Sequence, residues 1–434
     1  MLPIAQIFPN FAPNEVNGDH TAASVTTKYK EEIKMKKMIA GLFGMALMSG
    51  AAFADAGAPA PCAKDLSKAV EKVNYVETDV AGVRLNGYVD VGYIYNFTGH
   101  AKVNNRVGSD SINAGDFSVN MVKLTIEKAL TDKNEWQAGF RTDLMFGKDA
   151  GTFTGNGHAS TSEFFLEQGY VVFRAPYGNG IDVKAGKFAS WLGYEVTERP
   201  ANLNITYSQM YAVLPATMTG VSLEYPINNN LEVGVAIGNG ARDTNFGWDD
   251  NRDGYGIMAK VNYKVGGGNA NWQNSVYYSW DSAYEIASVP NNGSENVVIY
   301  DTVFNWAPKF ANGKLLLGVN ADLGYAEGTT LNDSSSSSTL WSAAGYAKYQ
   351  FTDLFSLAGR VAYVHVGNPD VFYTDTLAGH FLAQDNTSFT LTAGFNVVEN
   401  LVIRAEYRVD IGNNTTSTEG DIAHTAAVQA VYTF

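Results

Sequence analysis

Hydrophobic and polar residues alternate one by one along most of the chain from residue 83 onward. In the final stretch, 425–434, Val428, Tyr432 and Phe434 fall on one side of the alternation, and Gln429 falls on the other. Successive side chains of a β-strand point to opposite faces, so this pattern predicts strands with one apolar face and one polar face. The segments that fit lie near 83–97, 116–129, 134–147, 163–175, 180–187, 217–225, 229–239, 254–265, 270–281, 294–307, 313–326, 339–350, 353–365, 386–398, 400–411 and 421–434.

The connections between these segments alternate between short turns and long polar loops. Short turns contain 131–133, 176–179, 226–228, 266–268, Thr352 and Glu399, and the long loops are 98–115, 148–162, 188–216, 240–253, 282–293, 327–338, 366–385 and 412–420. Outer-membrane barrels have short periplasmic turns and long outer loops, whereas a soluble sandwich has no reason to keep this parity. The sequence therefore predicts an all-β fold, a transmembrane antiparallel up-and-down β-barrel of about 16 strands over 83–434.

Charged residues share the face opposite to the apolar one. They include Arg84, Asp90, Arg141, Arg404 and Arg408. A charge that faces lipid at the bilayer midplane costs about 2–4 kcal/mol, so we expect these side chains to point into a lumen. A barrel of this size is too wide for side chains to fill, and the pattern therefore predicts a water-filled channel.

The strongly apolar stretch 38–54 has the features of an export signal. Lysines precede it, and Ala52-Phe53-Ala54 ends it in the A-x-A pattern, which predicts cleavage before Asp55. We expect a secretory signal peptide over 35–54 that starts at Met35 or Met38.

The flanking segments have different expected roles. Residues 1–34 would then be a mis-called start without structural meaning. Residues 55–82 are expected to form a periplasmic linker, with helical spacing of apolar residues over 65–77.

Composition narrows the functional classes. Only 17% of the 434 residues are charged, 12% are aromatic and 43 are glycine, which favours β structure over helix. The net charge is −14, whereas a nucleic-acid-binding protein usually has an excess of basic residues, so this class is not expected. Cys62 is the only cysteine, so no internal disulfide is possible.

Motifs for metal binding or catalysis are weak. Asp249–Gly254 matches the first half of a calcium loop, but its twelfth position is Lys260 rather than glutamate. We therefore expect a solvated acidic loop, with no defined metal site and no cofactor, and the alternative is loose Ca²⁺ binding at the cell surface. The histidines after the signal (His100, His158, His365, His380 and His424) have no serine or aspartate partner by spacing, so no catalytic residue is expected and the protein is not expected to be an enzyme. The serine run 334–338 is expected to be a loop tip.

Several segments resemble the OmpL-like β-barrel porin family. They are QGYVVFRAPYGNG at 168–180, KAGKF at 184–188, GYE at 193–195, LNGYVD at 85–90, and Asn204, Tyr207 and Ser208 before Thr219-Gly220. The chain departs from the expected pattern at Gly169 and at Gln209-Met210. The resemblance implies a porin of the Gram-negative outer membrane, and it implies that the C-terminal residues Tyr432 and Phe434 signal barrel assembly.

The long loop 189–216 is rich in apolar residues, so it is expected to pack on another part of the protein. General porins fold their third long loop into the lumen as a constriction, and this loop resembles it in position and length. Glu195, Glu198 and Arg199 would then face the inward arginines 141, 404 and 408, and the resulting field would select solutes. The alternative is a loop that packs over the barrel mouth or a subunit interface.

The expected function is passive diffusion of small hydrophilic solutes. The expected partners are outer-membrane lipid and lipopolysaccharide, the barrel-assembly machinery, these solutes and a second and third copy in a homotrimer, with no nucleic acid. The alternatives are a surface receptor or adhesin barrel without an open pore, an outer-membrane hydrolase, and a secreted soluble β protein.

Overall fold

The computed structural model describes residues 76–77, 82–97, 115–154, 163–239, 254–265, 268–280, 284–286, 289–330, 333–367, 385–412 and 422–434. The expected signal peptide, the stretch before it, most of the linker, the aspartates 249, 250 and 253, and the histidines 100, 158 and 380 lie outside these residues.

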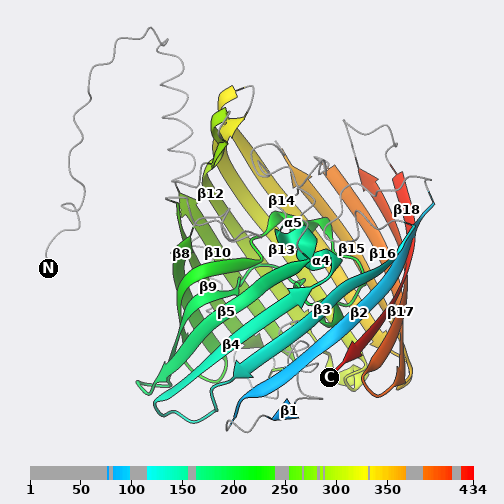
Figure 1. Cartoon of the computed structure of the whole chain (residues 1–434), viewed down its shortest axis with the longest axis horizontal. Helices are drawn as coiled ribbons and strands as arrows, with labels where there is room; N and C mark the ends of the chain where they lie inside the picture. The colour runs from blue at the N-terminus through cyan, green and yellow to red at the C-terminus, as the bar shows by residue number, and fades with distance from the viewer. Residues whose placement is uncertain are drawn as a thin grey trace, which may run out of the picture. The chain divides into compact units, whose positions relative to one another are not determined.

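Within the described residues, sixteen strands form one closed antiparallel ring in which each strand pairs with its neighbours in sequence (Figure 1). Pairing of β9 with β10 and of β18 with β2 completes the ring. The predicted barrel is therefore confirmed. The strands are β2 (Arg84–Asn96), β3 (Phe117–Lys128), β4 (Gln137–Phe146), β5 (Phe164–Ala175), β6 (Ile181–Ala189), β7 (Thr217–Pro226), β8 (Leu231–Asn239), β9 (Tyr255–Val265), β10 (Ala270–Trp280), β12 (Val289–Trp306), β13 (Leu315–Thr330), β14 (Asp333–Gln350), β15 (Phe355–Val366), β16 (Asp385–Val398), β17 (Leu401–Gly412) and β18 (Ile422–Thr433).

The other described elements are short. Strand β1 (Val76–Glu77) pairs with β2, and β11 (Tyr284–Ile286) pairs with β12. The helices are α4 (Lys148–Thr154), α5 (Gln209–Val213), and the 3-10 turns η1 (Arg199–Ala201) and η2 (Lys309–Ala311). Of the helices that the structure describes, none has the length and apolar character needed to cross a membrane.

The alternation of side chains places polar groups inside the ring. In β17, Arg404, Glu406 and Arg408 are buried on one face, whereas Tyr407 on the other face is 47% exposed. In β2, Asp90 is likewise buried and Tyr95 is exposed. The predicted faces of these strands are correct, and the burial of the inner face shows that protein fills part of the interior.

Several elements differ from the sequence prediction. Strands β13 and β14 extend beyond the predicted ends, so the serine run 334–338 belongs to β14 and is not a loop tip. Cross-strand backbone hydrogen bonds hold this extension, and they need no apolar alternation. The end of the predicted helix 65–77 forms β1, and α4 was not predicted because a helix of seven residues is too short to show a period.

The ring closes at the last residue of the chain. Phe434 exchanges two backbone hydrogen bonds of 2.9 Å with Gly87 in β2. A Cβ atom at Gly87 would lie 2.9 Å from Phe434 Cζ, so the glycine leaves space for the ring. A substitution at Phe434 can therefore remove the side-chain contact and keep the backbone hydrogen bonds.

We propose that the Phe434 side chain is an assembly signal, and predict that Phe434→Ala lowers the yield of folded barrel in the outer membrane. The variant keeps the backbone bonds to Gly87, so its refolding from urea into detergent is expected to match that of the unchanged protein. Yield and refolding are measured by heat-modifiable gel mobility. Phe351→Ala, at another exposed aromatic residue, is the control. Equal yields of the two variants in cells would contradict the signal role.

Candidate functional site

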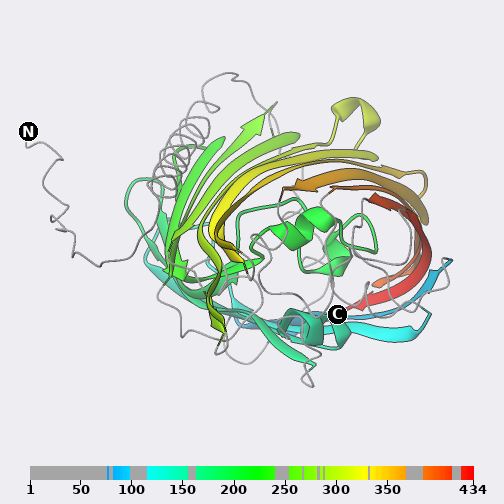
Figure 2. The same ribbon diagram turned by 90° about the horizontal axis from the view of Figure 1, so that it is seen from above.

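Residues 190–216, which we call the inner segment, run from β6 to β7 through the interior of the ring. Viewed from above, its helix α5 lies inside the circle of strands (Figure 2). Its ends are adjacent, because Ser190 N donates a 3.0 Å hydrogen bond to Ala216 O and Ala189 pairs with Thr217. Nearly every residue of the segment is buried. The inner segment therefore folds back through the lumen and returns to the same place in the wall.

Apolar side chains fix one side of the inner segment to the wall. Tyr194 stacks on Tyr346 of β14 with ring centroids 3.9 Å apart and an interplanar angle of 12°. A Cβ atom at Gly318 of β13 would lie 2.4 Å from Tyr194 Cε2, so only glycine admits this ring. Trp191 and Met210 belong to the same buried cluster. Burial of this apolar surface explains why the loop contains so many apolar residues.

Strands β15 to β17 bind the middle of the inner segment through charged side chains. Glu195 forms a buried ion pair with Arg360 and accepts hydrogen bonds from Ser208 N (2.7 Å) and Ser208 Oγ (2.6 Å). Glu406 accepts hydrogen bonds from Ile205 N at 2.6 Å and Thr206 Oγ1 at 2.5 Å. These contacts give the buried backbone of the segment partners that a strand would otherwise supply.

Two further arginines of β17 donate to carbonyl oxygens of the inner segment. Arg408 Nη1 contacts Tyr207 O at 2.6 Å, and its Nη2 contacts Asp410 at 2.6 Å. Arg404 Nη1 contacts Asn202 O at 2.8 Å, and its Nη2 contacts Arg199 O at 3.0 Å. Charged donors make stronger hydrogen bonds than neutral ones, so both arginines hold the segment.

Arg199 is fully buried and bridges the inner segment to α4. Its Nε and Nη2 contact the Asp149 carboxylate at 2.5 and 2.8 Å, and its Nη1 donates to Ile205 O at 2.8 Å. Its Cζ lies 4.5 Å from the centre of the Tyr207 ring. Burial raises the pKa of Tyr207 and Tyr211 above their usual range, so both phenols of the segment stay neutral at physiological pH.

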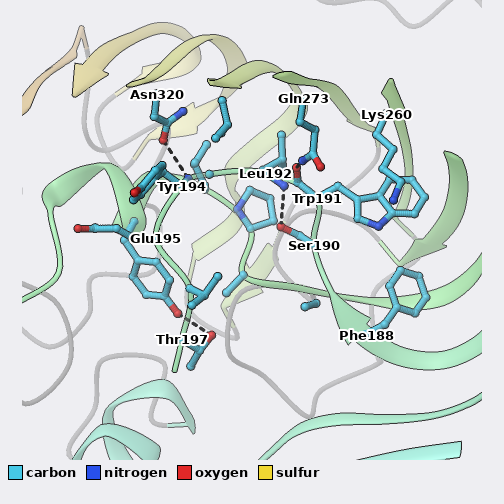
Figure 3. A pocket seen from close by; sticks show the side chains of 18 of the residues that line it. Phe188, Ser190, Trp191, Leu192, Tyr194, Glu195, Thr197, Lys260, Gln273 and Asn320 are labelled. Atoms are coloured by element: carbon cyan, nitrogen blue, oxygen red, sulfur yellow. Dashed lines mark hydrogen bonds between the residues drawn. The ribbon is translucent and has the colours of Figure 1, made fainter. Parts of the chain in front are cut away.

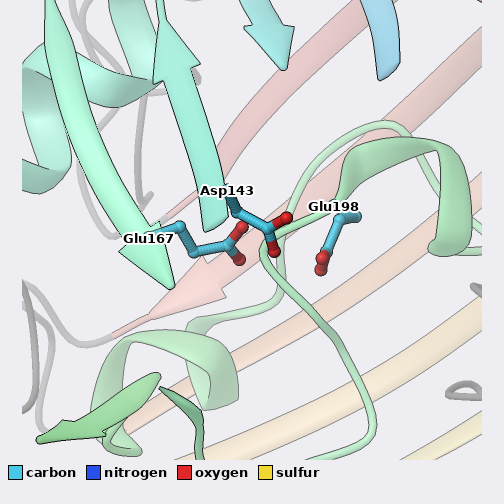
Figure 4. Close-up of side chains that lie close together, drawn as sticks. All are labelled: Asp143, Glu167 and Glu198. Carbon is cyan, nitrogen blue, oxygen red and sulfur yellow. The ribbon is translucent and has the colours of Figure 1, made fainter. Parts of the chain in front are cut away.

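Three carboxylates, those of Asp143, Glu167 and Glu198, converge beside this segment (Figure 4). Their ligand oxygens lie within 4.8 Å of one another. The ammonium group of Lys123 contacts all three, at 2.6 Å to Glu198, 2.8 Å to Glu167 and 3.2 Å to Asp143. Lys123 therefore already supplies the cation that this acidic cluster requires, and the residues do not fit a metal centre.

The predicted lumen residues are brought together, but with partners other than those expected. Glu195 pairs with Arg360, Glu198 with Lys123 and Arg199 with Asp149, rather than with arginines 141, 404 and 408. Arg141 contacts Asp143 at 3.0 Å and Glu127 at 3.3 Å. Asp90 accepts from Asn120 and Gln429, whereas Arg84 is exposed at the start of β2.

Arg360 and Lys123 could have been found from the sequence. Both occupy polar positions in predicted strands with the parity of the inward face. Asp149 lies in a loop without any period, so no sequence signal marked it.

A cavity of about 560 Å³ remains between the inner segment and the wall formed by β4 to β10 and β12 to β14 (Figure 3). Trp191 O accepts hydrogen bonds from Gln273 Nε2 at 2.5 Å and Ser275 Oγ at 2.9 Å. Tyr194 N donates to Asn320 Oδ1 at 3.1 Å, and Lys260 Nζ lies 4.8 Å from the centre of the Trp191 ring. Charged, amide and aromatic groups therefore line a space that can hold water and a small solute.

The histidine environment differs from the sequence prediction. His365 Nδ1 lies 2.8 Å from Asp385 Oδ1, which also accepts from the Tyr363 hydroxyl at 2.5 Å. The positions of His365 and Tyr363 have the parity of the outward face of β15, next to Trp341. This aspartate partner was missed because it lies on the neighbouring strand, and the group sits away from the lumen.

Residues 82–434 match the protein family described as "Putative beta-barrel porin-2, OmpL-like". The chain belongs to this family. It is accordingly a porin-type β-barrel of the bacterial outer membrane. Among curated proteins, none matches the chain significantly.

Several solved outer-membrane proteins have a similar fold. The outer membrane channel DcaP of Acinetobacter baumannii is 11% identical, with a TM-score of 0.55 over 82% of this chain and 99% of that chain. An anion-selective porin from Comamonas acidovorans is 12% identical, with a TM-score of 0.52 over 81% and 99%. OmpT of Vibrio cholerae in its trimer form is 12% identical, with a TM-score of 0.50 over 81% and 99%. At these identities the likeness establishes the fold alone.

Replacing Arg360 by glutamine is predicted to loosen the inner segment. Removing one partner of a buried ion pair costs about 3–5 kcal/mol, because the Glu195 carboxylate stays buried without its counter-charge. The free energy of local opening is measured by hydrogen exchange of the amides in 190–216.

The double variant Glu195→Gln, Arg360→Gln should recover part of this loss. Arg174→Gln is the control, because the pair of Arg174 with Asp182 is partly exposed and should contribute about 1 kcal/mol or less. Unchanged exchange of the inner segment in Arg360→Gln would show that this pair does not hold it.

Proposed function

We propose that this barrel is a passive diffusion channel for small hydrophilic solutes and that the inner segment forms its constriction. The supporting observation is that residues 190–216 run through the ring and are tied to both sides of it, to Lys123 and Asp149 on one side and to Arg360 and Glu406 on the other. A ring of sixteen strands is wide enough for an aqueous channel, so a segment across it narrows the path of a solute.

The charges around this constriction bear on the proposed selectivity. Glu195, Glu198 and Arg199 carry the charges of the inner segment, and Arg141, Arg404 and Arg408 with Asp90 carry those of the wall near it. Most of these charges are compensated by direct ion pairs. We therefore infer that the channel discriminates by size and by local hydrogen bonding more than by one strong transverse field.

The proposed partners follow from the barrel surface. Outward residues such as Val361 and Leu391 are half-exposed, which suits contact with outer-membrane lipid and lipopolysaccharide. Insertion would require the barrel-assembly machinery, and the trimer form of the Vibrio cholerae relative supports a homotrimer. We further propose a secretory signal over 35–54 and no enzymatic role, since the His365 group faces away from the lumen.

The constriction is tested by deleting most of the inner segment between its two adjacent ends. Residues 192–214 are replaced by a short Gly-Asn linker, which preserves the Ser190–Ala216 hydrogen bond and the β6–β7 register. Single-channel conductance in planar bilayers is predicted to rise at least about twofold, because the widened path of a sixteen-stranded barrel is aqueous.

Val361→Leu, on the outward face of β15, is the control and should leave the conductance unchanged. Heat-modifiable mobility verifies that each variant is folded. A folded native barrel that never conducts would refute the channel and favour a receptor or adhesin. A shortened variant with native conductance would refute the constriction alone.

A further inference from the structure

A second cavity of about 330 Å³ lies between the inner segment and β14 to β18. Pro200 and Leu203 of the inner segment form one side of it. Asn400 and Thr433, beside the short β16–β17 turn and at the end of β18, place it near the end of the ring that carries the short turns. The cavity is therefore distinct from the 560 Å³ cavity beside Trp191.

The charged side chains that line this cavity are all positive. Among the described residues that line it, Lys348 and Arg404 are the only charged ones. The larger cavity, by contrast, is lined by five glutamates as well as by cations. Two like charges in one cavity repel each other, and an anion between them would remove that repulsion.

Lys348 differs from three lysines of the lumen that form ion pairs. Lys123, Lys184 and Lys260 each contact at least one glutamate. Within the part of the chain that the structure describes, the ammonium group of Lys348 has no hydrogen bond and no ion pair. It is half-buried at an inward position of β14. Its charge is thus available to a ligand in the cavity.

Arg404 adds positive charge without a carboxylate partner. Its guanidinium contacts Gln429 Oε1 at 2.6 Å and carbonyl oxygens of the inner segment, all of which are neutral acceptors. Among the described residues no carboxylate forms an ion pair with it. Two walls of the cavity therefore each carry a cation without a direct ion pair.

A hydroxyl group and an apolar surface complete the lining. Ser356 of β15 pairs in register with Gly394 of β16, and a Cβ atom at position 394 would lie 2.8 Å from Ser356 Oγ. The glycine therefore leaves the hydroxyl open to the cavity. Ala358, Val402 and Val431 supply apolar surface nearby. A ligand that fits has an anionic group and a short hydrocarbon body.

We propose that this cavity binds a small organic carboxylate. The Lys348 ammonium contacts the carboxylate oxygens, Ser356 donates a hydrogen bond, and Arg404 supplies a second positive charge. The volume corresponds to about ten water molecules, which suits a solute of this size. This inference rests on the proposed function in that the ligand reaches the cavity through the lumen.

The test measures binding to the full-length mature protein in detergent by calorimetry at low ionic strength. Benzoate, benzamide and the benzamidinium cation have nearly the same shape and carry negative, zero and positive charge. Benzoate should bind at least about tenfold more tightly than benzamide, and benzamidinium should bind most weakly, because hydrogen bonds to charged groups are the stronger ones.

Variants locate the site. Lys348→Gln should weaken benzoate binding about tenfold to a hundredfold, Ser356→Ala about twofold to tenfold, and Lys348→Arg only slightly. Lys184→Gln removes the same charge from the lumen, but from a lysine that is paired with Glu224, and should leave benzoate binding unchanged. Heat-modifiable mobility verifies the fold of every variant.

Two outcomes would overturn the proposal. Benzamide could bind as tightly as benzoate, or Lys184→Gln could weaken binding as much as Lys348→Gln does. The binding assay does not depend on ion current, so the channel proposal and the binding-site proposal can be refuted independently. A protein that binds benzoate without conducting refutes the channel, and a conducting protein that does not bind benzoate refutes this site.

Discussion

The constraint on which the whole structure depends is that every backbone N–H and C=O group at lipid depth must be hydrogen-bonded within the protein, because the bilayer core offers no water. The ring meets it by closing β18 onto β2, with Thr433 opposite Tyr88, and by continuing from β9 to β10 without a break. Closure fixes the register of all sixteen strands relative to one another. It therefore also fixes which side chains point inward, since a slip of one residue would exchange the two faces of a strand.

The inward face then creates a second requirement. Arg360, Glu406 and Arg408 are buried, and a buried charge without a partner costs several kcal/mol. The inner segment has the complementary problem, because its irregular backbone is enclosed and lacks strand partners. Glu406 accepts hydrogen bonds from the backbone amides of residues 205 and 206, and Arg408 donates one to the carbonyl oxygen of Tyr207. The backbone of the inner segment thus gives the buried charges of the wall their partners, and these charges give the backbone its partners. Wall and segment are thus stable together in a way that neither would be alone.

Much of the fold could be predicted because alternation is a local property. Each of the sixteen strands was placed within a few residues of its predicted ends, except where β12, β13 and β14 extend farther. Those extensions rely on pairing outside the lipid, where the outward face need not be apolar. The face of Arg404 and Arg408 was predictable for the same local reason.

The partners within the site were not predictable to the same degree. Glu195 and Arg360 are 165 residues apart in sequence, and their contact depends on the stagger of strands around the ring and on the path of the inner segment. Alternation carries no information about either quantity. Asp149 lies on the short helix α4, and its pairing with Arg199 depends on how α4 and the inner segment meet in space. The residue types of the site could therefore be predicted from the sequence, whereas their pairing depends on the three-dimensional structure of the closed ring.

Net charge and local charge act on a solute at different distances. The chain is acidic overall, with a net charge of −14, which would repel anions from its surface. At physiological ionic strength this repulsion is screened over about 8 Å, whereas charges inside a protein cavity are screened much less. A solute near Lys348 and Arg404 therefore experiences those two cations more than the distant acidic surface. An acidic barrel can hold an anion in its lumen, because the electrostatic potential inside a cavity depends on whether the nearby charges are paired. The net charge of the whole chain matters less at that distance.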